Sequence, residues 1–253
     1  VTFTEKAGVN SVIIDSVADL KAVIQNVSFA VSLYSGQMCT APQNFFIPAS
    51  GVKQGDTVIP YEEVKKALVD AIAGIAAHPQ MGPGTLGAIQ SDVTVKRVNS
   101  VKDLDATVLL EPNKVANSEF PEARTSSHVV LEVEAKDFGI YENELFGPIV
   151  LIIKTKDTNQ SVQIAKDMAA KHGAITCAAY TTDDATANYI TEEMEEVFAP
   201  VSLNLVGPIW VNQHAGFSDF HVTGGNPAGN ASFTNPEYVS KRFVWVGHRK
   251  ISA

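Results

Sequence analysis

The sequence predicts an α/β domain in which a mostly parallel sheet is flanked by helices. Short apolar runs alternate with longer stretches of helical period along most of the chain, and the run Ile149–Ile153 is apolar throughout. Such alternation is typical of parallel sheets, because a chain that pairs two parallel strands needs a crossover connection between them. An unbroken apolar strand indicates that both of its faces are covered.

The expected elements alternate along the chain. Strands are predicted at Asn10–Asp15, Gln43–Pro48, Val108–Pro112, His128–Val133, Ile149–Ile153, Ile175–Tyr180, Val201–Leu205 and Ile209–Val211. Helices are predicted at Val17–Ser35, Tyr61–Ile75, Val93–Ser100, Ser161–Lys171 and Asp183–Val197. In the first helix, Leu20, Val23, Ile24 and Val27 recur at helical spacing, and Gly36 follows where a left-handed cap is common.

Three segments are expected to lack most regular structure. The loop Ala49–Pro60 carries two glycines and is predicted to be exposed, and Met81–Gly87 is predicted to be a turn-rich connection. The C-terminal stretch is rich in Gly, Asn and Pro, with a last strand expected at Arg242–Val246. We therefore expect a domain core over residues 1–212 and a loop-rich tail over residues 213–253.

Composition narrows the class of protein. The chain has 253 residues, of which 45% are hydrophobic and 19% charged, and its net charge of −9 argues against a nucleic-acid surface. Two cysteines suit a reducing cytoplasm, and no apolar run reaches the roughly 18 residues that a membrane helix needs. The chain begins with Val1 instead of Met, and its first ten residues resemble the middle of a protein. We therefore expect it to be part of a longer cytoplasmic protein.

Cys39 is the first candidate for chemistry. It lies just beyond a helix end in Ser35-Gly36-Gln37-Met38-Cys39-Thr40, on a turn that can aim backbone N–H groups and a side chain at one point. A buried, inert cysteine is the alternative, because unpaired cysteines are among the most buried residues. Cys177 lies inside an apolar strand and fits that alternative better.

Acidic residues supply two further candidates. Glu5 could act as a general base if burial raised its pKa; otherwise it is an exposed acid near a chain end. Glu144 and Phe146 lie in Glu144-Leu145-Phe146-Gly147-Pro148, directly before the apolar strand. Loops at strand ends often contact ligands in α/β sheets, but a turn with a core phenylalanine is the alternative.

In this order the three features resemble the aldehyde dehydrogenase superfamily. Gly36-Gln37-Met38-Cys39 is similar to the family's Gly-Gln-x-Cys motif, and Glu144-x-Phe146-Gly147-Pro148 to its Glu-x-Phe-Gly-Pro motif. Glu5 precedes the cysteine by 39 − 5 = 34 positions, a separation typical of the family. The resemblance covers nearly the whole chain, but only the family's catalytic domain.

The chain departs from the family pattern in three places. Ala7-Gly8-Val9 stands where the family commonly has Gly-Gly-Lys, and Tyr34-Ser35 where it often has an Asn. Val222-Thr223-Gly224-Gly225 is a divergent form of the family's C-terminal Phe-Gly-Gly. With the extra loop at Ala49–Pro60, this combination resembles the phenylacetate-degradation (PaaN-like) subfamily. That resemblance implies an aldehyde of bacterial aromatic catabolism.

The resemblance also implies a mechanism. Cys39 attacks an aldehyde, hydride passes to NAD or NADP, and Glu5 activates the water that releases the acid. Glu144 binds the nicotinamide ribose, and Phe146 packs beside the nicotinamide. A Gly-rich nucleotide-binding turn and a second oxyanion donor are not visible in the sequence. We therefore expect that the N-terminal nucleotide-binding domain is absent, that the isolated chain is inactive, and that its full-length parent is a homo-oligomer.

Two functions of other classes stay open. A cofactor-independent thiol hydrolase or thioesterase built on Cys39 would need a histidine base, and the nearest in sequence is His78, which is predicted to be exposed. In a non-catalytic interaction domain, Cys39 would be buried. No metal site is expected, because His214 and His221 lie seven positions apart without a tight ligand pair.

Overall fold

The computed structural model describes residues 7–210 and 247–251. Its strands are β1 (Ser11–Ile14), β2 (Asn44–Pro48), β3 (Val52–Gln54), β4 (Thr57–Ile59), β5 (Thr107–Leu110), β6 (Val129–Glu134), β7 (Ile149–Thr155), β8 (Cys177–Tyr180), β9 (Val201–Leu203) and β10 (His248–Lys250). Its helices are α1 (Leu20–Ser32), the 3-10 helix η1 (Leu33–Gly36), α2 (Tyr61–Ala77), α3 (Met81–Thr85), α4 (Asp92–Val101), α5 (Phe138–Tyr141), α6 (Thr158–His172) and α7 (Asp184–Glu195). No helix in the described ranges is long and apolar enough to cross a membrane.

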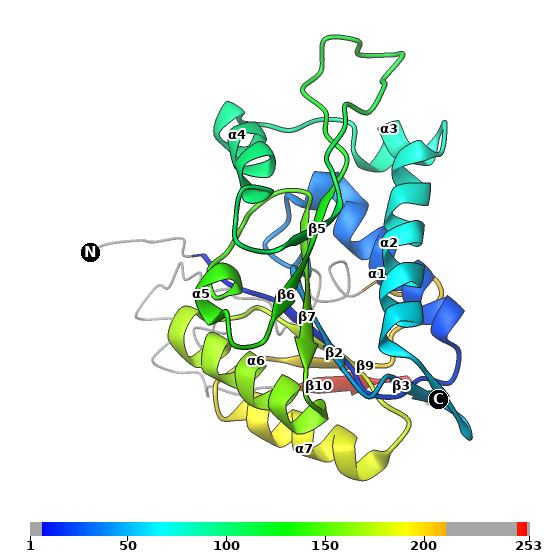
Figure 1. The fold of residues 1–253 in the computed structure, drawn as a ribbon, viewed down its shortest axis with the longest axis vertical. Coiled ribbons are helices and arrows are strands. Elements are labelled where there is room, and N and C mark those ends of the chain that lie inside the picture. Colours follow the sequence, from blue (N-terminus) through cyan, green and yellow to red (C-terminus); the bar gives the residue numbers. More distant parts are fainter. Residues whose placement is uncertain (1–6, 211–246, 252–253) are drawn as a thin grey trace, which may run out of the picture.

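The strand order confirms the predicted α/β class. Eight strands form the main sheet in the order β10-β9-β8-β1-β2-β7-β6-β5 (Figure 1). Neighbours run parallel from β10 as far as β6, and β5 then pairs antiparallel at the edge. The hairpin of β3 and β4 forms a separate small sheet. The central strand β1 therefore has β2 on one side and β8 on the other.

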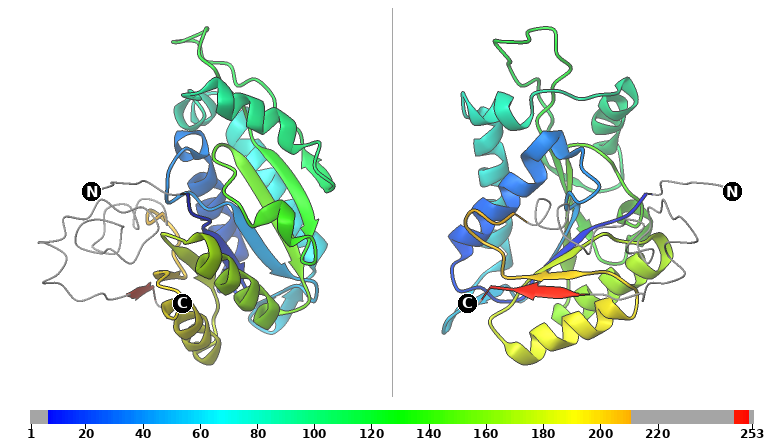
Figure 2. Two further views of the ribbon diagram at one scale, coloured as in Figure 1. Left: turned by 90° about the vertical axis from the view of Figure 1, so that its left-hand side faces the viewer. Right: turned by 180° about the vertical axis from the view of Figure 1, so that it is seen from behind.

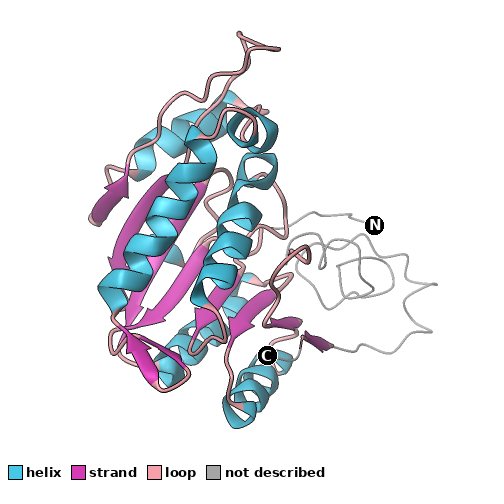
Figure 3. Ribbon diagram, turned by 90° about the vertical axis from the view of Figure 1, so that its right-hand side faces the viewer, coloured by secondary structure: helices cyan, strands magenta, loops and turns pink. Residues whose placement is uncertain are grey.

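Helices cover both faces of the main sheet, and each face has its own core (Figures 2 and 3). On one face, α1 and α2 pack on a cluster that includes Phe45 and Ile152. On the other, α4, α5, α6 and α7 pack on a cluster that includes Phe46 and Ile153. Successive residues of a strand point to opposite faces, so each central strand supplies both clusters. This burial explains the unbroken apolar runs that predicted the strands.

The first helix is shorter than predicted at both ends. It begins at Leu20 instead of Val17, because the Asp19 carboxylate accepts hydrogen bonds from backbone N–H groups of the first turn. Its α-helical part ends at Ser32 instead of Ser35, where the backbone leaves helical geometry.

Two segments predicted as irregular contain regular structure. Ala49–Pro60 forms the β3–β4 hairpin, in which Gly51 and Gly55 have φ of 91° and 57°. Met81–Gly87 contains the short helix α3. Glycine and proline content predicted a loop in both places, but in the hairpin the glycines shape the turns that flank very short strands. The helix α5 was not predicted either, since a single turn shows no periodicity.

The C-terminal region differs from the prediction in detail. Ile209 and Trp210 lie in no strand, so the strand predicted from Ile209 is wrong for its described residues. Instead the Trp210 ring packs on Phe29 of α1, with ring centroids 4.4 Å apart. The strand predicted at Arg242–Val246 lies outside the described residues. Within the predicted loop-rich tail, β10 pairs parallel with β9.

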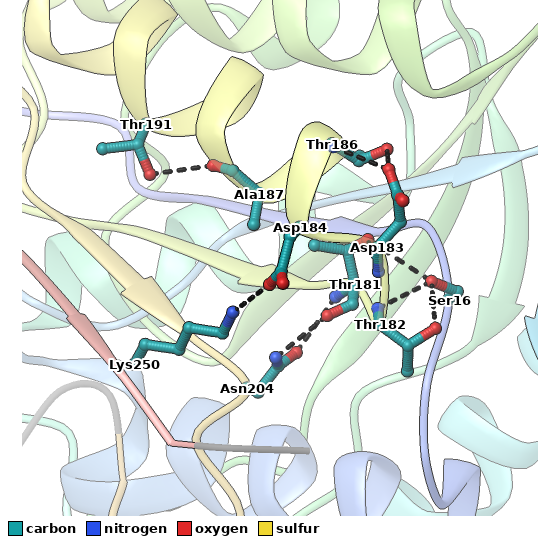
Figure 4. Close-up of polar contacts among 10 residues, drawn as sticks. All are labelled: Ser16, Thr181, Thr182, Asp183, Asp184, Thr186, Ala187, Thr191, Asn204 and Lys250. Atoms are coloured by element: carbon teal, nitrogen blue, oxygen red, sulfur yellow. Dashed lines mark hydrogen bonds and ion pairs between the residues drawn. The ribbon is translucent and has the colours of Figure 1, made fainter.

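Side chains at the carboxyl edge of the sheet bind one another (Figure 4). Ser16 Oγ accepts from the backbone N–H of Thr182 (2.8 Å) and lies 3.1 Å from the Thr182 hydroxyl. The Asn204 side chain accepts from Thr181 N–H (3.0 Å) and donates to the Thr181 carbonyl (2.9 Å). These contacts tie the ends of β1, β8 and β9 together and so stabilise this edge of the sheet.

His128 is fully buried at the amino end of β6. Its Nε2 lies 3.2 Å from the carbonyl oxygen of Val31 in the last turn of α1, and its Nδ1 has no partner among the described residues. Because the carbonyl only accepts, Nε2 carries the proton of a neutral ring. Burial lowers the pKa of His128 from 6.5 to about 4.

Acidification is therefore expected to destabilise the fold through His128. Below pH 6.5 the unfolded chain binds a proton on this ring that the folded protein excludes, so stability falls as pH falls toward the folded pKa of about 4. We expect the free energy of unfolding in urea to drop by about 2 kcal/mol between pH 6.5 and about 4.5. The variant His128→Gln should show a flatter dependence, and equal slopes in both proteins would contradict this role.

Candidate active site

Of the residues singled out by sequence, Cys39, Glu144 and Phe146 gather at the amino edge of the sheet. Cys39 lies in the segment 36–42 that precedes β2, here called the cysteine turn. Glu144 lies in the segment 142–148 that precedes β7, here called the Glu144 loop. Because β2 and β7 are adjacent and parallel, their amino ends meet. Open α/β sheets usually bind ligands at the opposite, carboxyl edge.

Strained backbone leads into the cysteine turn. Tyr34, Ser35 and Gly36 have φ of 53°, 58° and 64°. Only glycine adopts this left-handed region at no cost, so the two preceding residues cost about 1 kcal/mol each. The surroundings hold this geometry: the Ser35 hydroxyl (3.2 Å) and the Gln37 amide (2.9 Å) both donate to the carbonyl of Ala88. Strain held in this way is typical of functional sites.

Asn10 fixes the position of Cys39, whose side chain is exposed. The Asn10 amide donates to the carbonyls of Cys39 (2.8 Å) and Ala41 (3.0 Å). Its oxygen accepts from the N–H groups of Ile175 (3.0 Å) and Thr176 (3.2 Å), just before β8. One side chain at the start of β1 therefore joins the cysteine turn to the neighbouring strand on the other side.

Two glycines let the cysteine turn and the Glu144 loop touch. A Cβ atom on Gly36 would lie 2.4 Å from the carbonyl oxygen of Gly147. Gly147 has φ of 133°, and a Cβ there would lie 2.9 Å from Thr94 on α4. Arg97, also on α4, donates to the carbonyl of Phe146 at 2.8 Å. Gly36 is thus needed for the close approach of the two backbones, and Gly147 for its own backbone geometry and for the packing of the loop against α4.

The Glu144 loop is also anchored where it begins. The Glu142 carboxylate accepts from Lys171 and, at 3.1 Å, from His172 at the end of α6. The Lys171 ammonium, followed by the His172 ring, lowers the pKa of Glu142. Glu144 and Phe146, both half-buried, follow in the same loop. The structure thus brings Glu144, Phe146 and Cys39 into adjoining segments.

Two hollows are lined in part by the cysteine turn. A cavity of about 20 Å³ separates it from the Glu144 loop, with a lining that includes Gly8, Asn10, Gly36, Met38, Gln43 and Glu144. It has room for about one water molecule, so a dinucleotide would bind outside it. A wider groove of about 750 Å³ lies beside Tyr34, Gln37 and Phe120. Glu5 lies outside the described residues, and the chain that follows it reaches the small cavity at Gly8.

His172 contacts the Glu144 loop through Glu142, and two other described histidines, His78 and His248, contact other segments. His78 is exposed at the end of α2, where its Nδ1 accepts from two backbone N–H groups. His248 lies 3.8 Å from Glu195 of α7. These contacts give no support to a histidine-activated thiol. In residues 7–210 and 247–251, no group of three His, Cys, Asp or Glu side chains is placed to hold a metal, and His214 and His221 lie outside these ranges.

Cys177 is the buried cysteine that its strand predicted. It opens β8 with 1% of its surface exposed, and burial raises the pKa of its thiol to about 12. We expect iodoacetamide to label Cys39 at least about a hundredfold faster than Cys177 in the native protein, because the thiolate is the reacting form. Peptide mass spectrometry measures both rates. Slow, pH-insensitive labelling of Cys39 would instead support an inert cysteine.

Sequence reasoning missed three residues of this site. Asn10 and Gln43 are polar residues directly before buried strands, a signal that could have drawn attention to them. Arg97 carries no such signal. Its position on a predicted helix suggests an exposed side chain and does not indicate the contact with the Phe146 carbonyl.

The fold and the site together define an α/β protein with an exposed thiol beside an acidic loop at the amino edge of a parallel sheet. Residues 2–241 match the model of the aldehyde dehydrogenase family, and the chain belongs to this family. The predicted superfamily is thereby confirmed.

This chain spans less than half the length of three of the proteins that it resembles. The crystal structure of an NAD-dependent aldehyde dehydrogenase from Burkholderia multivorans matches with a TM-score of 0.86 and 40% identity, over 95% of this chain and 43% of that one. The α-ketoglutaric semialdehyde dehydrogenase of Bacillus subtilis is 24% identical over 169 residues, 65% of this chain and 33% of its own length. The N-succinylglutamate 5-semialdehyde dehydrogenase of Acinetobacter baylyi is 26% identical over 162 residues, 64% of this chain and 32% of its own length.

Proposed function

We propose that the chain is the catalytic domain of an NAD(P)-dependent aldehyde dehydrogenase that oxidises an aldehyde to a carboxylic acid. The observation that carries the proposal is the exposed Cys39, held by Asn10 beside the Glu144 loop in a chain of this family. An exposed cysteine on a braced turn suits a nucleophile, which must meet its substrate in a fixed geometry.

The chemistry begins at Cys39. Its thiolate attacks the carbonyl carbon, a C–S bond forms, and the carbonyl oxygen becomes the alkoxide of a thiohemiacetal. The backbone N–H of Cys39 stabilises this oxygen, with a second donor from elsewhere. When bound, NAD(P) supplies the acceptor for the hydride whose loss turns the thiohemiacetal into a thioester. Glu5 then takes a proton from water, which attacks the thioester, breaks the C–S bond and releases the acid.

The described residues fit only one part of a dinucleotide. Glu144 would bind the nicotinamide ribose through its carboxylate, and Phe146 would lie beside the nicotinamide. In residues 7–210, no strand-to-helix connection of the main sheet carries the Gly-rich turn that binds a pyrophosphate. Upstream residues would therefore hold the rest of the cofactor and decide between NAD and NADP.

The finer assignment follows from the motif departures. They favour the phenylacetate-degradation subfamily, and with it a bacterial, cytoplasmic enzyme of aromatic catabolism that works as a homo-oligomer. Two of the relatives are named as semialdehyde dehydrogenases, which is compatible with a ring-opened semialdehyde as substrate.

A comparison of two forms of the protein tests the proposal. We expect NAD(P)-dependent oxidation of aldehydes by a form that includes the upstream half, and none by the 253-residue chain alone. Clear turnover by the short chain would contradict the domain assignment. If the longer form oxidises neither semialdehydes nor aromatic aldehydes with either cofactor, the proposed activity is wrong.

A further inference from the structure

Gln43 is a buried amide between the cysteine turn and the Glu144 loop. It is the last residue before β2, and its side chain and backbone together are 7% exposed. Its backbone N–H lies 3.1 Å from the carbonyl oxygen of Asn10, and its carbonyl accepts from the N–H of Leu151 at 3.0 Å. The side chain of Gln43 therefore starts from a point that is fixed on both sides.

The Gln43 side chain binds both peptide groups that flank Glu144. Its Oε1 accepts from the N–H of Leu145 at 2.6 Å, and its Nε2 donates to the carbonyl of Asn143 at 3.1 Å. The N–H belongs to the peptide group after Glu144, and the carbonyl belongs to the one before it. Peptide groups are planar, so the orientation of these two groups fixes φ and ψ of Glu144. The two bonds thereby fix the direction of its Cα–Cβ bond.

Other anchors of the loop act further along the chain. Arg97 binds the carbonyl of Phe146, two residues after Glu144. Lys171 binds Glu142, two residues before it. These contacts hold the ends of the loop, whereas Gln43 holds the two peptide groups of Glu144 itself.

We propose that Gln43 is a positioning residue that aims the Glu144 carboxylate at the nicotinamide ribose. The proposal rests on the ribose-binding role proposed for Glu144. Gln43 follows Cys39 by four residues in one braced segment. The same short piece of chain therefore sets the thiol and, through its amide, the ribose-binding carboxylate.

The first test removes the amide and keeps the length of the side chain. In a longer form of the protein that includes the proposed nucleotide-binding domain, Gln43→Met should raise the KM for NAD(P) about tenfold, because the two neutral hydrogen bonds that hold the peptide groups of Glu144 are lost. A third bond, from Gln43 Nε2 to Asn44 Oδ1 at 3.1 Å, is lost with them. The kcat at saturating cofactor should stay within about threefold, since the bonds act on cofactor binding. Labelling of Cys39 by iodoacetamide without cofactor should change by less than about twofold, because the backbone bonds of Gln43 remain.

A second variant gives a readout that a merely structural role would not move. Gln43→Glu keeps the acceptor for Leu145 N–H but, when ionised, sets an oxygen against the carbonyl of Asn143 and the side-chain oxygen of Asn44. Protonation restores a donor at that position. The KM for NAD(P) of this variant should therefore be raised at pH 8 and should fall toward the wild-type value as the pH is lowered. This variant also decides the matter if Gln43→Met does not fold.

Gln54→Met is the matched control. Gln54 accepts a single backbone hydrogen bond, from Leu20 N–H at 2.8 Å, at the opposite edge of the sheet. Its loss should leave the KM for NAD(P) unchanged. An unchanged KM in both Gln43 variants, or a KM that rises equally in the control, would overturn the positioning role alone. Absence of NAD(P)-dependent turnover in the wild-type protein would overturn the proposed function first, and this inference with it.

Discussion

Replacement of Cys39 by serine is expected to abolish aldehyde oxidation. Serine has nearly the same size, but its hydroxyl stays protonated near neutral pH, whereas the thiolate of cysteine is the reacting species. We expect kcat to fall by at least about a thousandfold, because the covalent route through the thioester is lost. Formation of NAD(P)H by a longer form with the proposed N-terminal nucleotide-binding domain measures the effect.

Cys177→Ala is the matched control for this substitution. Cys177 is buried in β8, so its truncation should lower stability by about 1 kcal/mol and leave kcat within about twofold. A Cys39→Ser protein that keeps its fold and most of its activity would remove Cys39 from the mechanism.

Asn10→Ala is expected to have the largest effect on stability. The change leaves the N–H groups of Ile175 and Thr176 buried without their acceptor and releases the carbonyls of Cys39 and Ala41. We expect the free energy of unfolding to fall by about 3 kcal/mol, since buried polar groups lose their partners. The kcat should fall about tenfold as well, because the cysteine turn loses its fixed position.

Asn99→Ala is a suitable control for Asn10. Asn99 is exposed on α4 and makes one side-chain hydrogen bond, to the carbonyl of Val95 at 3.0 Å. Its replacement should change stability by less than about 0.5 kcal/mol and leave kcat unchanged. If urea unfolding shows equal effects for Asn10→Ala and Asn99→Ala, the hydrogen bonds of Asn10 do not hold the cysteine turn in place.

The central strands of the main sheet were predictable because both of their faces are buried. The apolar run at β7 and the mixed run at β2 mark such strands without knowledge of their neighbours. The end of α1 was not predictable in the same way. Tyr34 and Ser35 adopt left-handed geometry that neither residue favours, and only the packing around Ala88 holds them there. The hairpin after β2 was missed because its strands are too short to show alternation.

The residues of the candidate site were predictable, but not what holds them. Cys39 and Glu144 stand in recognisable motifs, and their adjacency follows once β2 and β7 are known to be neighbours. The contacts of Asn10 depend on β1 lying between β2 and β8, an order that the sequence does not state. The hydrogen bonds of Gln43 to the Glu144 loop likewise depend on the register between β2 and β7, which the sequence does not state.

Acylation of the 253-residue chain tests the role of Cys39 most directly, because it needs no cofactor. The chain is treated with p-nitrophenyl acetate, quenched in acid and digested for peptide mass spectrometry. We predict one acetyl group on the peptide that contains Cys39 and none on the peptide of Cys177. After prior alkylation with iodoacetamide, we predict no acetyl group on the Cys39 peptide. Absence of an acetyl adduct on Cys39, or acetylation that survives alkylation, would contradict its role as the nucleophile.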